Sequence, residues 1–341
     1  MNPTVVRASI YFGIIGLIFG FAMGTGLTRF NWAQYTPWSS LGAGGPSGGD
    51  PGAMLDQFDI SNLQIERDQL LAGGPPKDGI PAISDPDIVT RAEVDFLEPD
   101  DRIVAVTING ESRAYPIRML NWHEIVNDTL GGVPIAVVYC PLCDSVTVVD
   151  RRVEGETLEF GVSGLLYQSN VLMYDRTHDA LWSQILLDAV SGPYAGRSLT
   201  HYPGWAITSY EQWQDNHPEG TVVTFETGHR RSYERSPYEG YMASEELFFP
   251  VKREDDRLGR KDRIIGVRFN DVVRAYPVGA VHRAPAGRLI DDFNGDQLII
   301  EADVESGRTA VLRAPDGART IHTFWFSWAA AHPETEIYAE E

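Results

Sequence analysis

The longest apolar run of the chain lies close to its N-terminus. Residues 10–27 are eighteen uncharged, mostly apolar residues, and a bilayer core of ~30 Å is crossed by about 20 helical residues. This pattern predicts one transmembrane anchor helix over residues 1–29. The alternative is a cleaved signal peptide, for which Ala22-Met-Gly24 offers only a poor cleavage site.

The predicted anchor helix carries small residues on one face. Gly16, Gly20 and Gly24 form two consecutive G-x-x-x-G steps, which allow a second helix to approach closely within the lipid. We expect this face to pack against other integral-membrane subunits, although glycine is also common in membrane helices generally. Residues 30–56 follow as an interfacial segment and a glycine-rich stalk, and the acidic bulk of the chain is expected on the extracytoplasmic, periplasmic side.

Beyond the stalk the pattern changes to short strands. Alternating or continuous apolar runs over 102–106, 135–139, 146–149 and 298–302, with Asn-Gly or Asn-Asp turns nearby, are typical of hairpins. Two Trp-x-x-x-His-Pro segments, at Trp213 and Trp328, predict short helices that end at a proline. This part of the chain is therefore predicted to be a strand-dominated α+β fold.

One sequence unit occurs twice, with a constant offset of 161 residues at its start. The repetition predicts an internally duplicated module with pseudo-symmetry. Its first copy spans 57–226, a linker spans 227–262, and a shorter second copy spans 263–341. The matching segments are Arg102-Ile-Val-Ala-Val106 with Arg263-Ile-Ile-Gly-Val267, Asn109 with Asn270, and Arg113-Ala-Tyr-Pro116 with Arg274-Ala-Tyr-Pro277.

The first copy is longer by about 46 residues, which fall between Cys140 and Trp205. Features present in both copies are expected to be architectural, whereas features of the first copy alone are candidates for a functional site. By this criterion the repeated Arg-Ala-Tyr-Pro segments are structural. The motifs unique to the first copy are Trp122-His-Glu124, Tyr139-Cys-Pro-Leu-Cys143, Ser163-Gly-Leu-Leu-Tyr167, Asn170-x-x-Met-Tyr-Asp-Arg176 and Leu181-Trp-Ser-Gln184.

Composition and charge exclude several classes of protein. A hydrophobic content of 43% excludes a disordered chain. The net charge of −20 argues against nucleic-acid binding, because a phosphate backbone requires a basic surface. Two cysteines cannot supply a four-thiolate zinc or iron–sulfur site.

The Cys140-Pro-Leu-Cys143 turn has the spacing of a two-thiol site. Both thiolates, together with His123 and Met173, would be soft ligands suited to Cu(I). Glu124 and Asp175 would orient the histidine by contacting its ring rather than the metal. A second interpretation is a purely structural pair, either disulfide-bonded or reduced.

The third interpretation of this turn is thiol–disulfide exchange. That chemistry favours a cysteine at a helix N-terminus, where the thiol pKa is lowered. Here the turn joins two β-patterns, and Asp144 adds a negative charge that is expected to raise a thiol pKa.

These first-copy motifs together resemble an uncharacterised prokaryotic family catalogued as a domain of unknown function. The resemblance covers residues 80–223 and rests on Asn121-Trp-His-Glu124 and the cysteine, Ser-Gly-Leu-Leu-Tyr and Leu-Trp-Ser-Gln motifs. Asp144 stands where a small residue is expected. The resemblance implies an extracytoplasmic, often membrane-tethered domain and no established reaction.

The sequence thus favours a non-catalytic, membrane-anchored accessory subunit of a larger, energy-transducing membrane complex, in contact with membrane lipid and with other subunits. The alternatives are a copper-type metal-binding or delivery protein that uses Cys140 and Cys143, and a thiol–disulfide oxidoreductase at the same turn.

Overall fold

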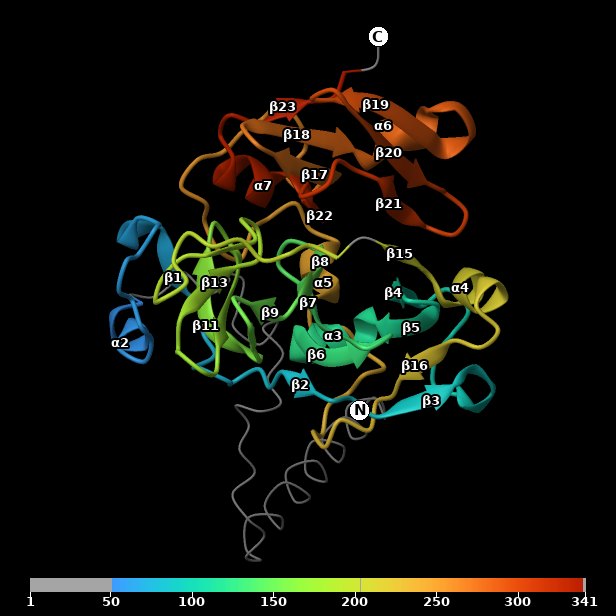
Figure 1. Cartoon of the computed structure of the whole chain (residues 1–341), viewed down its shortest axis with the longest axis horizontal. Coiled ribbons are helices and arrows are strands. Elements are labelled where there is room, and N and C mark those ends of the chain that lie inside the picture. The colour runs from blue at the N-terminus through green and yellow to red at the C-terminus, as the bar shows by residue number, and fades with distance from the viewer. Residues whose placement is uncertain (1–50, 203, 340–341) are drawn as a thin grey trace, which may run out of the picture. The chain divides into compact units, whose positions relative to one another are not determined.

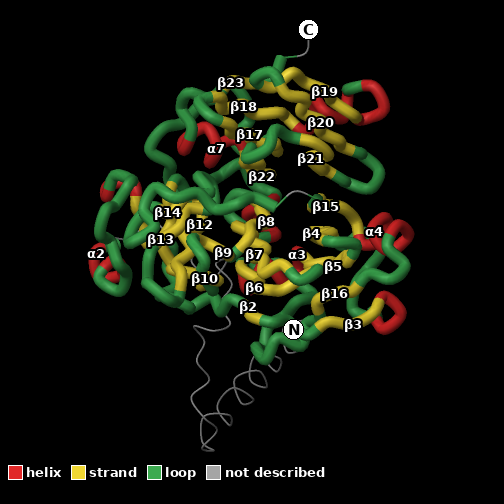
Figure 2. The backbone as a smooth tube through the Cα atoms, viewed as in Figure 1, coloured by secondary structure: helices red, strands yellow, loops and turns green. Residues whose placement is uncertain are grey.

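The computed structural model describes residues 51–202 and 204–339 (Figures 1 and 2). Strands dominate and short helices flank them, so the predicted α+β class is confirmed. Within the described ranges, no helix is both long and apolar enough to cross a membrane. The predicted anchor helix with Gly16, Gly20 and Gly24, and the stalk up to residue 50, lie outside the described residues.

Two eight-stranded sheets form the larger part of the described fold (Figure 1). The first contains, in spatial order, β19 (Arg288–Phe293), β20 (Asp296–Ala302), β21 (Thr309–Arg313), β15 (Trp205–Ser209), β4 (Arg102–Ile108), β5 (Glu111–Pro116), β16 (Thr221–Val223) and β3 (Ile88–Thr90). The second contains β2 (Ile83–Ser84), β6 (Ile125–Leu130), β7 (Val133–Cys140), β8 (Ser145–Asp150), β22 (Arg319–Phe324), β17 (Arg263–Phe269), β18 (Val272–Pro277) and β23 (Glu336–Ile337).

A five-stranded sheet is built mainly from residues 160–189. Its order is β1 (Leu70–Ala72), β11 (Phe160–Tyr167), β12 (Asn170–Asp175), β13 (Leu181–Ser183) and β14 (Asp188–Ala189), and a separate ribbon pairs β9 (Arg152–Val153) with β10 (Glu156–Thr157). The helices are α2 (Gly52–Leu55), α3 (Ile117–His123), α4 (Tyr210–Asn216), α5 (Glu239–Met242), α6 (Val278–Arg283) and α7 (Trp325–Ala331), with 3₁₀ turns η3 (Arg67–Gln69), η4 (Arg91–Glu93) and η5 (Pro285–Gly287).

The predicted hairpins form where the turn residues allow them. Asn109 and Gly110 both have positive φ, of 50° and 86°, which is the backbone of a tight two-residue hairpin between β4 and β5. Asn270, with a φ of 53°, has the same positive-φ conformation in the turn between β17 and β18. The predicted short helices are also confirmed: α4 and α7 each end just before a His-Pro pair, and His217 Nδ1 lies 3.1 Å from the Trp213 carbonyl that it caps.

The two large sheets share one order of strands. In the first sheet β15, β4, β5 and β16 are neighbours, and the last two run parallel. In the second sheet β22, β17, β18 and β23 are neighbours in the same arrangement, again with a parallel last pair. Each four-strand set continues into a meander from the other half of the chain, so β19–β21 extend the first sheet and β6–β8 extend the second.

The repeated Arg-Ala-Tyr-Pro segments make equivalent contacts in the two sheets. Arg113 and Tyr115 both donate to the Asp128 carboxylate, at 2.5 and 2.7 Å. The Asp291 carboxylate accepts from Arg274 and Tyr276, at 2.7 and 2.6 Å. These segments therefore tie the first hairpin of each unit to the strand that follows its helix.

Candidate functional site

Cys140 and Cys143 lie in the tight turn that joins β7 to β8. The Cys143 backbone N–H donates to the Cys140 carbonyl oxygen at 3.2 Å, and the next residue, Asp144, has a positive φ of 45°. Both cysteines are free thiols with at most 1% of their surface exposed. The turn therefore presents two reduced sulfurs to the interior of the protein.

The sulfurs are surrounded by hydrogen-bonding groups. The Cys143 thiol donates to the Ser169 carbonyl oxygen at 3.0 Å. The Cys143 thiol and the backbone N–H groups of Val171 and Cys143 lie close to the Cys140 sulfur. Burial nevertheless raises the pKa of the Cys140 thiol well above its ordinary value, and the contact with Cys143 raises it further, so the neutral thiol is favoured in this state.

Ser169 reaches the thiols from the tip of the β11–β12 hairpin. Gln168 and Ser169 form its two-residue turn with positive φ values of 50° and 63°, and both residues are buried. A buried turn of this kind is unusual because loops normally lie at the surface. The Ser327 hydroxyl of α7 donates to the Gln168 carbonyl at 3.0 Å and fixes the tip in place.

A buried polar network continues from the thiols into the five-stranded sheet. Ser145, Asn170 and Gln184 have no exposed surface. The Ser145 hydroxyl donates to Gln184 Oε1 at 2.7 Å, and Asn170 Nδ2 donates to both of these oxygens at 2.9 Å. Buried amides linked in this way fix one arrangement of β8, β12 and the residue after β13.

Two arginines neutralise the carboxylate next to the turn. Arg102 donates to both Asp144 oxygens at 3.0 and 3.1 Å, and Arg263 Nε donates to Oδ2 at 2.7 Å. Burial alone would raise the pKa of Asp144, but Arg102 and then Arg263 outweigh it, so the pKa is lowered. The negative charge of Asp144 is thus compensated, because the three groups together carry one positive charge.

Glu124 lies beside Cys140 at the C-terminal end of α3. Its φ is 58° and only 7% of its surface is exposed. Burial, and then the nearby Cys140, raise the pKa of Glu124 well above its ordinary value. With Leu142 it lines a cavity of about 30 Å³, so a largely neutral carboxyl group faces a small space next to the thiol turn.

The other predicted ligands lie in different surroundings. Both ring nitrogens of His123 are engaged, Nδ1 with the Pro81 carbonyl and Nε2 with the Tyr233 hydroxyl, each at 2.7 Å. Burial lowers the pKa of His123 to about 4. Met173 belongs to the same hydrophobic cluster as the two cysteines, whereas Asp175 accepts from Trp182 Nε1 at 2.9 Å.

The structure thus brings Cys140, Cys143 and Met173 into one cluster with Glu124 beside them. Across the described residues, no group of three or more His, Cys, Asp or Glu side chains is arranged to hold a metal ion. The ligand set that includes His123 stays a prediction.

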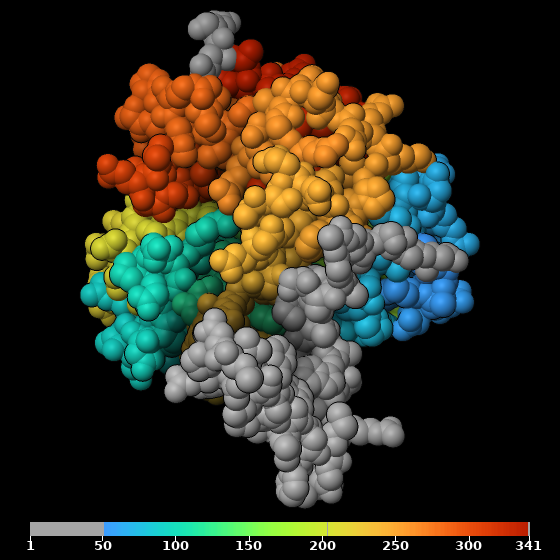
Figure 3. Space-filling view, turned by 180° about the vertical axis from the view of Figure 1, so that it is seen from behind, coloured from blue at the N-terminus to red at the C-terminus, as the bar shows by residue number. Residues whose placement is uncertain are grey.

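The segment 227–262, predicted as a linker, covers the thiol turn (Figure 3 shows it in yellow-orange). The Tyr241 hydroxyl of α5 donates to the Leu142 carbonyl at 2.7 Å. The Lys261 ammonium group donates to the carbonyls of Tyr241 and Ser244 and holds α5 in place. We call residues 238–251 the cover.

Sequence reasoning singled out the motifs that contain Asn170 and Gln184 but missed the partners outside them. Arg102 and Arg263 occupy matching positions of the repeated sequence, so the sequence criterion assigned them to the scaffold. Tyr241 lies in a stretch without periodicity. Its separation from Leu142 by 99 residues leaves no local signal for the contact.

Comparisons with known proteins yield a family and nothing more specific. A search of curated proteins found no match, and neither did a search of solved structures. The model of one family matches residues 77–322, a range that contains the thiol turn, the buried hairpin tip, the network and the cover. The chain therefore belongs to the family described as proteins of unknown function, DUF3179.

Proposed function

We propose that Cys140 and Cys143 form a binding site for a soft monovalent metal ion, with Cu(I) as the ion that the pair fits best. The observation that carries this proposal is the pair of adjacent, reduced and buried thiols, with two backbone N–H groups close to the Cys140 sulfur. Such N–H groups stabilise a sulfur that carries negative charge, as a metal-bound thiolate does.

The number and kind of donors favour Cu(I). Thiolate sulfur is a soft ligand and prefers soft ions, and two thiolates satisfy a two-coordinate Cu(I) ion. Structural zinc takes four ligands, which would require donors beyond the pair. Binding replaces two S–H bonds by two S–Cu bonds and releases two protons, so affinity is expected to increase with pH.

Charge around the turn supports the same ion. A bis-thiolate Cu(I) complex carries one negative charge, and a buried charge is stable only when it is compensated. Arg102, Arg263 and Asp144, the residue after Cys143, together carry one positive charge. Glu124 adds little negative charge because burial favours its neutral form.

The test is an anaerobic Cu(I) titration of the full chain in detergent against a chromogenic Cu(I) chelator. We expect one ion per chain, and none when Cys140 and Cys143 are both replaced by serine. Met173→Leu is the matched variant: it keeps the volume of the cluster and leaves both thiols, so binding should persist. Equal binding by the double variant would overturn the proposal.

A second measurement covers the case in which the double variant does not fold. X-ray absorption at the copper edge of the loaded, unaltered chain should show two sulfur neighbours and no nitrogen or oxygen neighbour. A copper ion surrounded by nitrogen or oxygen would place the metal elsewhere. Thiol–disulfide exchange is less well supported, because it calls for a lowered thiol pKa and that of Cys140 is raised.

We also propose that this site belongs to an extracytoplasmic, membrane-anchored accessory subunit. The support is the sequence of residues 1–29 and the face with Gly16, Gly20 and Gly24, which lie outside the described residues. Purification in mild detergent should co-isolate other membrane polypeptides. Recovery of the chain alone, as a monodisperse monomer, would count against this part.

An internal duplication is the third element of the proposal. Its support is the repeated sequence, the shared strand order of the two sheets, and the equivalent Arg–Tyr–Asp contacts. Superposition of β4–β7 and β15–β16 on β17–β20 and β22–β23 tests it. Backbones that do not superpose would remove the pseudo-symmetry.

A further inference from the structure

One end of the first sheet is β19 (Arg288–Phe293), and its outer edge is open (Figure 1). Leu289 and Phe293 are buried in a hydrophobic cluster, whereas Arg288, Ile290 and Asp292 are exposed, Ile290 by 57% of its surface. Within the described ranges, no strand pairs with this edge. Proteins usually protect an edge strand with a proline, a bulge or a covering segment, because its unpaired backbone groups can bond to another strand. β19 contains neither a proline nor a bulge.

The backbone of β19 directs alternate residues toward the open edge. The turn to β20 consists of two residues with positive φ, Asn294 and Gly295, which makes the residues that flank it a hydrogen-bonded pair. Alternation along the strand then turns the N–H and C=O groups of Arg288, Ile290 and Asp292 away from β20. The Arg288 N–H donates to the preceding turn η5, and the remaining groups face the open edge.

The second sheet carries an additional strand at the equivalent edge. β6 and β19 each begin a three-strand meander, and Asp128 and Asp291 occupy equivalent positions in them, because each accepts from an arginine and a tyrosine. The residue before Asp128, Asn127, pairs with β2, and its carbonyl accepts from the Asp85 N–H at 2.9 Å. The residue before Asp291 is Ile290. The fold therefore has room for a strand at this position of the meander.

The exposed side chains of β19 are complementary to a second copy of the same strand. When two such strands run antiparallel with Ile290 opposite the partner's Ile290, Arg288 lies opposite the partner's Asp292. Arg288 also pairs with Glu301, but Arg308 shares that carboxylate, so the two arginines retain one positive charge. Asp292 accepts from a backbone N–H and has no cationic partner in the described part of the chain. Opposite charges placed across two strands stabilise their pairing.

We propose that two copies of this chain associate edge to edge through β19, about a two-fold axis at Ile290, and so join their first sheets. The Ile290 N–H of each copy donates to the partner's Ile290 carbonyl, and the Asp292 N–H donates to the partner's Arg288 carbonyl. A two-fold axis makes identical edge strands antiparallel, which is the orientation that these groups require. A register centred on Leu289 or Asp291 would place a charged side chain opposite Ile290. This interface is independent of the thiol turn.

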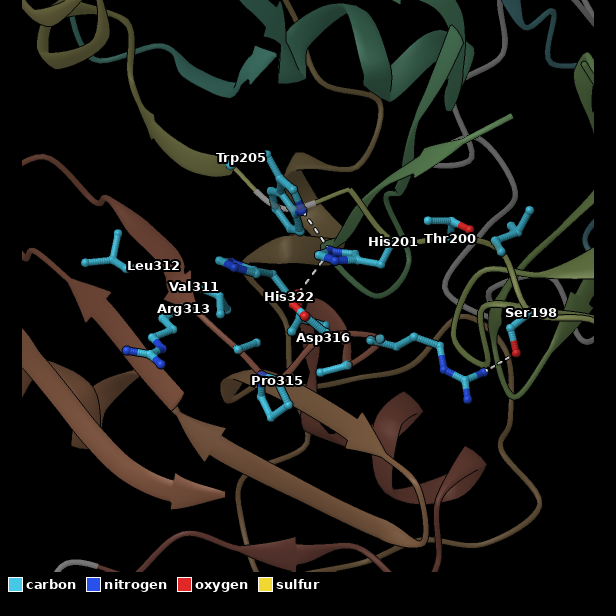
Figure 4. Close-up of a pocket in the computed structure, with 17 residues that line it drawn as sticks. Ser198, Thr200, His201, Trp205, Val311, Leu312, Arg313, Pro315, Asp316 and His322 are labelled. Carbon is cyan, nitrogen blue, oxygen red and sulfur yellow. Dashed lines mark hydrogen bonds between the residues drawn. The ribbon is translucent and has the colours of Figure 1, made fainter. Parts of the chain in front are cut away.

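The test is the association of the full chain in detergent, measured by light scattering over a range of concentrations. The unaltered chain should form dimers. Ile290→Asp, which brings two carboxylates together at the axis, should weaken the dimer at least about 100-fold. Leu312→Asp is the matched control and should leave the dimer unchanged, because Leu312 is also exposed, by 44%, but lies on β21 beside a separate pocket (Figure 4). A monomer at every concentration, or equal association of Ile290→Asp and the unaltered chain, would overturn the proposal.

A pair of charge variants tests the register. Arg288→Glu and Asp292→Arg should each be monomeric at concentrations at which the unaltered chain is dimeric, because like charges then face each other across the strands. When the two variants carry different fluorescent labels and are mixed, they should form dimers, since every contact again joins opposite charges. Energy transfer between the labels reports these mixed dimers. Their absence would overturn the antiparallel register about Ile290.

Discussion

Replacing Tyr241 by phenylalanine tests whether the cover controls access to the thiols. The change deletes one hydroxyl, which donates to the Leu142 carbonyl at 2.7 Å, and keeps the ring that packs on Phe248 with centroids 4.4 Å apart. Because both cysteines are at most 1% exposed, a thiol reagent reaches them only after this region opens locally.

The hydrogen bond sets the size of the effect. An intramolecular hydrogen bond contributes about 1 kcal/mol net, and a buried carbonyl left without a partner costs about 1–3 kcal/mol. Since 1.4 kcal/mol is a factor of ten in an equilibrium, the open population should increase between about five-fold and about 150-fold. When opening is fast relative to labelling, the labelling rate follows that population.

The assay is the rate of thiol modification by a chromogenic disulfide reagent, at one pH and without denaturant. Tyr276→Phe is the control, because it also removes a buried phenol hydroxyl, which donates to Asp291 at 2.6 Å, from a separate hydrophobic cluster. We expect faster labelling in Tyr241→Phe and an unchanged rate in Tyr276→Phe. Equal rates in Tyr241→Phe and the unaltered chain would show that the cover does not limit access.

Three further predictions concern stability, measured by urea denaturation. Asp144→Asn leaves the partly exposed Arg102 and Arg263 without their shared carboxylate and should lower the free energy of unfolding by about 1–2 kcal/mol; a loss below about 0.5 kcal/mol would contradict a stabilising role of this carboxylate. Folding lowers the pKa of His123 to about 4 and of His322 to about 3, so the unfolded chain takes up protons below pH ~6.5 first. The contribution of these two histidines to stability should therefore be constant above pH ~6.5 and fall between ~6.5 and ~4, and a flat profile over that window would refute it. Gly164→Ala, at a φ of 79° and against a backbone carbonyl, should destabilise the fold by more than Gly155→Ala, whose φ is 91° but whose surroundings are open; equal losses would refute the steric part.

Local sequence signals predicted the elements that depend on neighbouring residues. Asn109-Gly110 specifies its hairpin because both residues accept positive φ. Trp213 and Trp328 mark helices that end where His-Pro pairs stop them. The strand-dominated class follows from many such short signals.

The parts of the fold and of the candidate site that the sequence does not predict depend on contacts between residues far apart in the chain. The cover has one four-residue helix and no apolar period, so nothing in its own sequence shows that Tyr241 meets a carbonyl 99 residues away. The buried turn at Gln168 and Ser169 lacks the glycine that predicts a tight hairpin. Its burial becomes visible only when Ser327 and Cys143 are seen to bond to its carbonyls.

The rule that separates scaffold from site by repetition does not sort all residues around the thiol turn in the same way. Cys140, Asn170 and Gln184 are confined to the first copy and lie together, as the rule expects. Arg102 and Arg263 break it. They occupy the same position in the repeated sequence, at the first residue of β4 and of β17, and both bind Asp144, which has no repeated counterpart. Two residues at matching positions of the repeated sequence thus share one partner that lies outside the repeated segments. Here that convergence leaves one positive charge at the residue that follows Cys143, and neither arginine alone would leave an excess after pairing with Asp144.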